Sequence, residues 1–195
     1  VDGVHDGLFD AAKWSGRGGV VLTAHLGCPD LVRAVATTAR RFRVTVLMHT
    51  AHAQNFNRMI ERFSPDAPVR LVEVSRIDLG VAMNLSAAIE RGEWVVMAAD
   101  RVGASGDDSA APVEFLGGRA LLPTGPYILA AALGCPLYTL FCTRRGARFE
   151  VKFGLLAERV AAPRRARAES LAGYAQAFAR CMEEQLRATP WQWFN

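Results

Sequence analysis

Hydrophobic and polar positions follow two different periods along the chain. Short aliphatic runs typical of buried strands alternate with stretches whose apolar residues recur at helical spacing. The runs predict strands at 20–22, 44–48, 69–74, 94–98, 137–142 and 149–155. The helical spacing predicts helices at 4–14, 29–42, 53–63, 79–91 and 126–133, and a C-terminal helix with Leu171, Tyr174, Phe178, Met182 and Leu186 on one face. This alternation predicts an α/β fold with a largely parallel sheet flanked by helices.

The segments between these elements give weaker signals. Residues 113–116 and 119–122 are expected to pair as a hairpin through Gly117 and Gly118, and Thr124 can cap the helix that follows. Residues 102–111 are rich in Gly, Ser and Asp and predict a mobile loop, while the arginines of 158–167 predict an exposed basic loop. The uncharged run 120–143 is cut by prolines and glycines into pieces too short to span a membrane as one helix.

The first aliphatic run leads into the most informative stretch, His25-Leu-Gly-Cys-Pro-Asp30. Pro29 suits the first position of a helix and Asp30 its first turn, so His25 is expected on the turn between strand and helix. A bend at Gly27 can bring the side chains of His25 and Asp30 together. A carboxylate held against an imidazole fixes its tautomer and increases its basicity, which favours a general base.

A second candidate pair, Asp100-Arg101, follows the strand predicted at 94–98. Ligands of open α/β sheets bind beyond the carboxyl ends of strands, and the His25 turn lies at that same end if the two strands run parallel. Two interpretations of Arg101 stay open: a surface ion pair with Asp100, or a contact to a phosphate or an oxyanion.

Other reactive residues fit simpler interpretations. Cys28 lies beside the motif, but a small apolar role suits it better than a nucleophilic one. His49 and His52 have metal-ligand spacing without an evident third ligand, so we expect a polar loop and no metal site. The four cysteines show no paired spacing, which indicates reduced thiols in a cytoplasmic setting.

Length, composition and net charge limit the number of domains and the kinds of binding partner. A chain of 195 residues with 51% hydrophobic content is expected to form a single domain over 1–195. The net charge of +4 suits a phospholipid surface, an acidic carrier protein or nucleic acid, and charge alone does not choose among them. The start has neither a signal peptide nor an initiator methionine, which suggests a fragment.

The His25-x4-Asp30 motif and later landmarks together resemble one family, the bacterial lipid A biosynthesis acyltransferases. The landmarks stand in the family's order over roughly 15–195: Ala99-Asp-Arg101, Phe115-Leu-Gly-Gly-Arg119, Pro123-Thr-Gly-Pro126 and Trp191-Gln-Trp-Phe-Asn195. A lone His-x4-Asp is weak evidence, whereas several ordered matches are much stronger.

The resemblance implies a glycerol-3-phosphate acyltransferase-like fold and transfer of a fatty acyl group from an acyl carrier protein or coenzyme A to a hydroxyl of a lipid-like acceptor. His25 and Asp30 would be catalytic, and the substrate would contact Gly27, Asp100, Arg101, Thr124 and Gly125. No cofactor, metal or nucleic acid is implied. The expected location is the cytoplasmic face of the bacterial inner membrane, held peripherally on its anionic surface, with an upstream membrane-anchoring segment absent from this chain.

Two alternatives belong to other classes. The family usually has Asn-Trp where Cys28-Pro29 stands here, which motivates a non-catalytic lipid-binding or scaffold domain. A thioester hydrolase, in which water replaces the acceptor, would use the same base. The basic segment with Arg159, Arg164, Arg165 and Arg167 could face either anionic lipid head groups or an acidic carrier.

Overall fold

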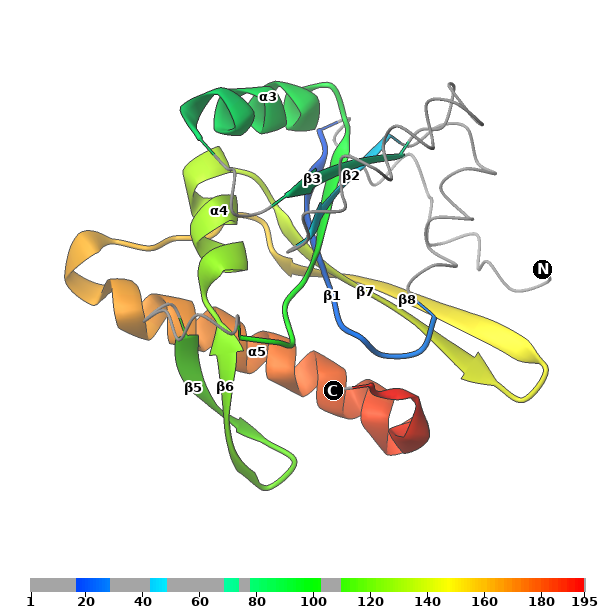
Figure 1. Ribbon diagram of the computed structural model, residues 1–195. Coiled ribbons are helices and arrows are strands. Elements are labelled where there is room, and N and C mark those ends of the chain that lie inside the picture. Colours follow the sequence, from blue (N-terminus) through cyan, green and yellow to red (C-terminus); the bar gives the residue numbers. More distant parts are fainter. Residues whose placement is uncertain (1–16, 29–42, 49–68, 74–77, 103–109, 195) are drawn as a thin grey trace.

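A six-stranded sheet forms the centre of the computed structural model, which describes residues 17–28, 43–48, 69–73, 78–102 and 110–194 (Figure 1). The strand order is β3-β2-β4-β1-β7-β8. All neighbours pair in parallel except β7 and β8, which are antiparallel. The strands are β1 Gly19–Thr23, β2 Val44–Met48, β3 Val69–Glu73, β4 Trp94–Ala98, β7 Leu137–Arg145 and β8 Arg148–Ala157. The predicted α/β fold with a largely parallel sheet is therefore confirmed.

Helices and a separate hairpin complete the described part of the chain. The helices are α3 Leu79–Glu90, α4 Gly125–Leu133 and α5 Arg167–Ala188, with 3-10 turns η4 Arg164–Ala166 and η5 Pro190–Gln192. The hairpin strands are β5 Ala110–Phe115 and β6 Gly118–Pro123. In Figure 1 the long helix α5 passes between this hairpin and the strands β7 and β8. The helices predicted at 4–14, 29–42 and 53–63 lie outside the described residues.

The apolar strand runs are buried on both faces of the sheet. Val20 and Leu22 of β1 belong to the larger core cluster, which also holds buried residues of α3, α4 and α5. Val21 belongs to a second cluster with Trp94 and Leu140. A strand that packs on both faces needs a continuous apolar run instead of an alternating one, which is what the sequence of β1 supplies.

Three local predictions differ from the structure. Leu116 and Gly117, with φ of 52° and 80°, form the hairpin turn that was expected at Gly117 and Gly118. Thr124 occupies the N-cap of α4, but its side chain makes no capping hydrogen bond because its φ and ψ are already helical. The two expected loops are shorter than predicted. The loop expected at 102–111 ends where β5 begins at Ala110, and the basic loop expected at 158–167 ends where residues 164–166 form η4.

The uncharged run 120–143 is divided among β6, α4 and β7, as its prolines and glycines predicted. In the part of the chain that the structure describes, no helix combines the length and the apolar character needed to cross a membrane.

The helix α5 is anchored to the sheet by its apolar stripe. Phe178 has no exposed surface and stacks on Phe141 of β7, with ring centroids 5.9 Å apart. On its other side, Gln176 exchanges two hydrogen bonds with the backbone of Glu114 in β5, and Glu183 accepts one from the backbone of Leu116. The helix thus holds the hairpin and the sheet together.

We predict that Phe178→Ala lowers the free energy of unfolding by about 3–5 kcal/mol, because it leaves a cavity at the contact between α5 and β7. Urea denaturation followed by circular dichroism measures the change. Arg180→Ala, at an exposed position of the same helix, should change stability by less than about 0.5 kcal/mol. Equal losses in the two variants would contradict this assignment of the core.

Candidate active site

Two parallel strands end side by side and place the candidate residues. Thr23, the last residue of β1, stands opposite Ala98, the last residue of β4. The backbone N–H of Ala99 then donates to the carbonyl of Thr23 at 2.9 Å, so the two segments diverge only after this point. His25 and Asp100 follow their strands by two residues each and meet at this edge, as the parallel arrangement predicted.

A buried carboxylate holds the imidazole of His25. Nδ1 of His25 lies 2.9 Å from Oδ1 of Asp100, and the backbone N–H of His25 donates to Oδ2 at 2.9 Å. The Asp100 side chain has no exposed surface, whereas 40% of the His25 side chain is exposed. Since a carboxylate only accepts hydrogen bonds, Nδ1 carries the hydrogen and Nε2 of the neutral ring is left to accept a proton.

Trp193 completes the environment of the carboxylate. Its indole Nε1–H donates to Oδ2 of Asp100 at 3.1 Å. Its ring packs edge-on against Phe115 of the hairpin, with centroids 5.3 Å apart. Asp100 therefore receives donors from both His25 and Trp193, which replace the water that burial removes. The sequence reasoning used Trp193 only as a landmark, and nothing in its local pattern indicated this contact.

The C-terminal segment is bonded to the His25 loop through the backbone. The N–H of Gly27 donates to the carbonyl of Gln192 at 2.7 Å, and the N–H of Phe194 donates to the carbonyl of His25 at 2.9 Å. With 22 residues, α5 spans about 33 Å and returns the chain end to the carboxyl edge of the sheet, where the His25 loop lies. The loop that carries His25 is thereby fixed by residues from the far end of the chain.

Gly27 is required by both its conformation and its surroundings. Its φ is +73°, and a Cβ at this position would lie 2.0 Å from the carbonyl oxygen of Cys142. The next residue, Cys28, donates its N–H to that same oxygen at 2.8 Å. The predicted bend at Gly27 is therefore present, and it also lets the loop approach β7.

The burial of Asp100 decides against one interpretation of Arg101. Asp100 is 3% exposed and its carboxylate turns inward to His25 and Trp193, so the interpretation of Asp100 and Arg101 as a surface ion pair is wrong. Arg101 is exposed, and its Nη2 donates to the carbonyl oxygen of Phe194. Arg101 thus lies beside the His25 loop but is tied to the C-terminal segment.

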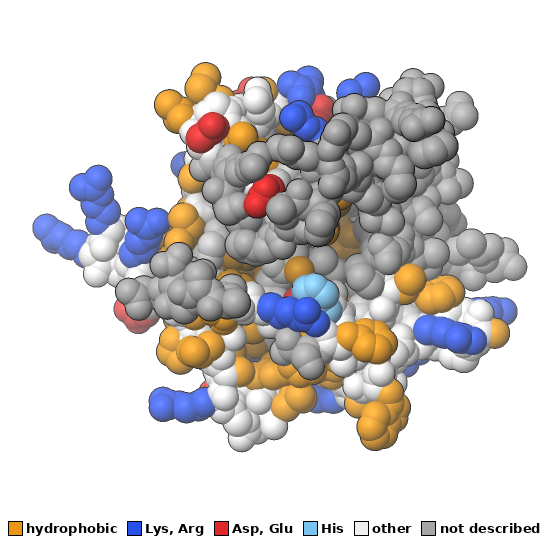
Figure 2. Space-filling model, in the orientation of Figure 1, with side chains coloured by type: hydrophobic (Ala, Val, Ile, Leu, Met, Phe, Trp, Pro, Cys, Tyr) orange, Lys and Arg blue, Asp and Glu red, His pale blue; other side chains and the backbone are white. Residues whose placement is uncertain are grey.

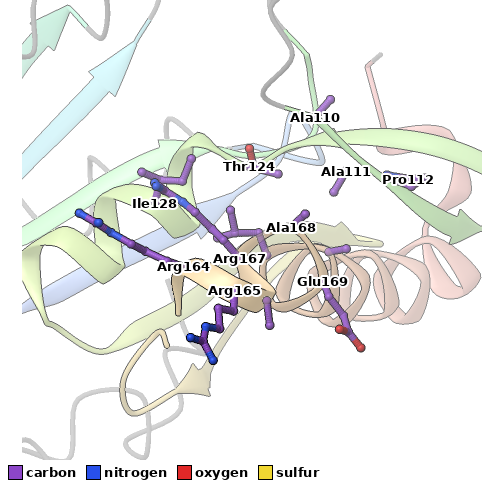
Figure 3. A pocket seen from close by; sticks show the side chains of 13 residues that line it. Ala110, Ala111, Pro112, Thr124, Ile128, Arg164, Arg165, Arg167, Ala168 and Glu169 are labelled. Carbon is purple, nitrogen blue, oxygen red and sulfur yellow. The ribbon is translucent and has the colours of Figure 1, made fainter. Parts of the chain in front are cut away.

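The remaining predicted substrate residues lie elsewhere. Thr124 lines a separate hollow of about 680 Å³ between β5, α4 and the start of α5, and neither His25 nor Asp100 lines it (Figure 3). Arg164, Arg165 and Arg167 stand around it; in Figure 3 Arg167 extends toward Ile128 while Arg165 points the opposite way. Gly125 is exposed, with open space where a Cβ would stand.

Some predicted residues cannot be placed. Asp30, His49 and His52 lie outside the described residues, so the expected contact between Asp30 and His25 stays a prediction. Across residues 17–28, 43–48, 69–73, 78–102 and 110–194, no three His, Cys, Asp or Glu side chains come together in a way that could hold a metal ion.

An exposed imidazole oriented by a buried carboxylate, at the carboxyl edge of a parallel sheet, is an arrangement that suits general-base catalysis. Residues 5–195 match the family of bacterial lipid A biosynthesis acyltransferases, and the chain belongs to that family. The resemblance noted in the sequence is thereby confirmed. A search of curated proteins finds no match.

We predict that Cys142 resists alkylation in the folded protein. Burial, and next the neighbouring thiol of Cys28, raise the pKa of Cys142 to about 11 from the usual 9.0. At pH 8 its reactive thiolate is therefore roughly a hundredfold scarcer than in the unfolded chain. Iodoacetamide labelling followed by peptide mass spectrometry should show slow modification of Cys142 that accelerates in urea. Labelling as fast in the native protein as in urea would contradict the buried environment.

We further predict that Trp193→Phe slows acyl transfer while leaving the fold intact. The phenyl ring keeps the contact with Phe115 but loses the N–H that bonds to Asp100, and a hydrogen bond to a charged group contributes about 1.5–3 kcal/mol. We expect kcat to fall about tenfold or more with little change in KM.

Arg180→Ala is the control, because Arg180 is exposed on α5 and is not among the donors to Asp100. Steady-state kinetics on detergent-dispersed lipid compare the two variants. Equal kcat values for Trp193→Phe and the parent protein would show that this hydrogen bond does not serve the reaction.

Proposed function

We propose that the protein transfers a fatty acyl group from a thioester donor to a hydroxyl of a lipid-like acceptor, with His25 as the general base. Membership in the acyltransferase family supports the class of reaction. The observation that carries the role of His25 is the hydrogen bond from its Nδ1 to buried Asp100, since it leaves Nε2 available on the exposed side of the ring.

In the proposed reaction, Nε2 of His25 takes the proton of the acceptor hydroxyl as its oxygen attacks the thioester carbonyl. The C–O bond forms and the C–S bond breaks, so that the acyl group passes to the acceptor. The leaving thiolate then takes the proton from the imidazolium. Asp100 stabilises the positive ring during this step, as a carboxylate on Nδ1 does in other histidine bases. The thiolate is a good leaving group, so no covalent acyl-enzyme is needed.

Two carboxylates compete for the orienting role. The sequence predicts Asp30, whereas the described residues place Asp100 on Nδ1. Nδ1 carries a single hydrogen, so one carboxylate at a time can accept it. We propose Asp100 as the orienting group and keep Asp30 as a second candidate that mutation can separate from it. Arg101, exposed beside the loop, is the proposed contact for a phosphate or for negative charge that develops during transfer.

The proposed partners follow from this chemistry. The donor is an acyl carrier protein or a coenzyme A thioester, and the acceptor is a lipid hydroxyl presented by a membrane. Gly27, Thr124 and Gly125 remain proposed substrate contacts from the family motifs. We place the reaction at the cytoplasmic face of the bacterial inner membrane, where the net charge of +4 favours anionic lipid.

We predict that His25→Ala lowers the transfer rate by about 10²- to 10⁴-fold, because the acceptor hydroxyl loses its base. Asp100→Asn should be slow as well, and adding it to His25→Ala should cost little more, since residues that act as one unit are not additive. Mass spectrometry of lipids after incubation with labelled acyl carrier protein and membrane extract measures these effects.

The controls are His5→Ala and Asp30→Asn in the same assay. His5→Ala should keep the parental rate, and Asp30→Asn should lose less than Asp100→Asn if Asp100 is the orienting carboxylate. A folded His25→Ala protein with the parental rate would exclude this mechanism. Release of free fatty acid at equal rates with and without lipid acceptor would identify a thioester hydrolase instead.

A further inference from the structure

Exposed aromatic side chains lie at the chain end that holds the active site together. Trp191 is 91% exposed and Phe194 is 64% exposed, although indole and phenyl rings are among the most apolar groups that a protein can bury. Phe149, at the start of β8, is also exposed. Within η5 and the residues after it, Trp191 points to solvent while Trp193, two residues on, reaches the buried Asp100.

The turn between β7 and β8 faces this segment and is strongly basic. Residues 144–150 contain Arg144, Arg145 and Arg148 against a single acid, Glu150. Oε2 of Glu150 forms an ion pair with Nε of Arg145 at 2.6 Å. Nε of Arg144 donates instead to the carbonyl of Gly146 at 2.8 Å, so this guanidinium stays available for an anion. Two of the three arginines thus add positive charge that Glu150 does not balance.

A groove of about 430 Å³ separates the basic turn from the exposed tryptophan. Arg144 and Arg145 line it on one side, and Trp191 and Gln192 line it on the other. Guanidinium groups bind phosphate oxygens through a planar fork, and an adjacent indole is the side chain that proteins place at the boundary between head groups and hydrocarbon. The groove therefore matches a phospholipid head group with its phosphate on the arginines.

The groove is built rigidly onto the active-site loop. The side-chain amide of Gln192 accepts from the backbone N–H of Arg144 at 2.7 Å and donates to the carbonyl of Arg144 at 2.7 Å. The carbonyl of Gln192 in turn accepts from Gly27, two residues from His25. Figure 2 shows the histidine on a face that also carries hydrophobic and basic side chains. A surface that rests on Trp191 and Arg144 would therefore be joined to the His25 loop through Gln192.

We infer that Arg144, Arg145, Arg148, Trp191 and Phe194 form a docking surface for an anionic phospholipid bilayer, with a head-group phosphate in the groove between the β7–β8 turn and η5. The inference rests on the proposed function, because it explains how a lipid hydroxyl reaches His25. A bilayer fits better than an acidic carrier protein because the exposed ring of Trp191 lines the groove with the arginines and the ring of Phe194 is exposed at the same chain end. Such rings gain from insertion at the lipid interface.

The test measures sedimentation of the full chain with phosphatidylcholine vesicles that contain or lack phosphatidylglycerol. Each arginine near an anionic surface contributes roughly fivefold to partitioning, so Arg144→Gln combined with Arg148→Gln should weaken binding to the anionic vesicles by about 25-fold. Trp191→Ala should weaken binding to both kinds of vesicle, because insertion of the ring does not depend on lipid charge. Added salt should lower binding of the parent protein to the anionic vesicles.

The matched control removes the same charge from the other basic surface. Arg164→Gln combined with Arg165→Gln, at the hollow of Figure 3, should bind anionic vesicles within about twofold of the parent. His25→Ala should bind like the parent while lacking transfer, so a failure of the proposed reaction is distinguishable from a failure of docking. Equal losses in the two arginine pairs would overturn the docking surface. If the variant with Arg144→Gln and Arg148→Gln binds vesicles like the parent protein but has a raised KM for acyl carrier protein, the docking surface is overturned and the turn is assigned to the carrier.

Discussion

The burial of the Asp100 carboxylate is the constraint on which the site depends. Removing a carboxylate from water costs several kcal/mol unless hydrogen-bond donors replace the water. Asp100 has no exposed side-chain surface, and its donors are the backbone and ring of His25 together with the indole of Trp193. These partners stand 75 and 93 residues away in the sequence. The chain must therefore bring both segments to the end of β4 before Asp100 can be buried.

The strand order meets this requirement. β1 lies between β4 and β7, so the loop after β1 has Asp100 on one side and Cys142 on the other. The positive φ of Gly27 allows the loop to approach β7, where a side chain would collide with the carbonyl of Cys142. The helix α5 then delivers Trp193 from outside the sheet. Each contact depends on a different element, which makes the position of His25 a property of the whole fold.

The sequence predicted the elements better than their contacts. The strands of the sheet were recognisable because burial on both faces demands uninterrupted apolar runs, as in Val20 to Leu22. The shared edge of His25 and Asp100 also followed from parallel strands. Their direct contact did not, because periodicity does not tell which strands are neighbours, whereas the five-residue spacing to Asp30 is visible without a fold. Thr124 illustrates a smaller limit: its residue type suits a cap, but its backbone angles prevent one.

The imidazole of His25 is oriented without being enclosed. Nδ1 and the backbone N–H of His25 both bond to Asp100, and the carbonyl of His25 accepts from the N–H of Phe194. The residue is therefore fixed through its buried atoms, while part of the ring stays exposed. A group fixed in this way loses little freedom when a substrate arrives, which is the advantage of preorganised sites. The C-terminal segment that supplies this support has side chains on both sides. Trp193 points inward to Asp100, and Trp191 points outward to solvent. A surface that engages Trp191 would therefore act on the same backbone that positions His25, which would link the proposed lipid-docking surface to the geometry of the proposed base.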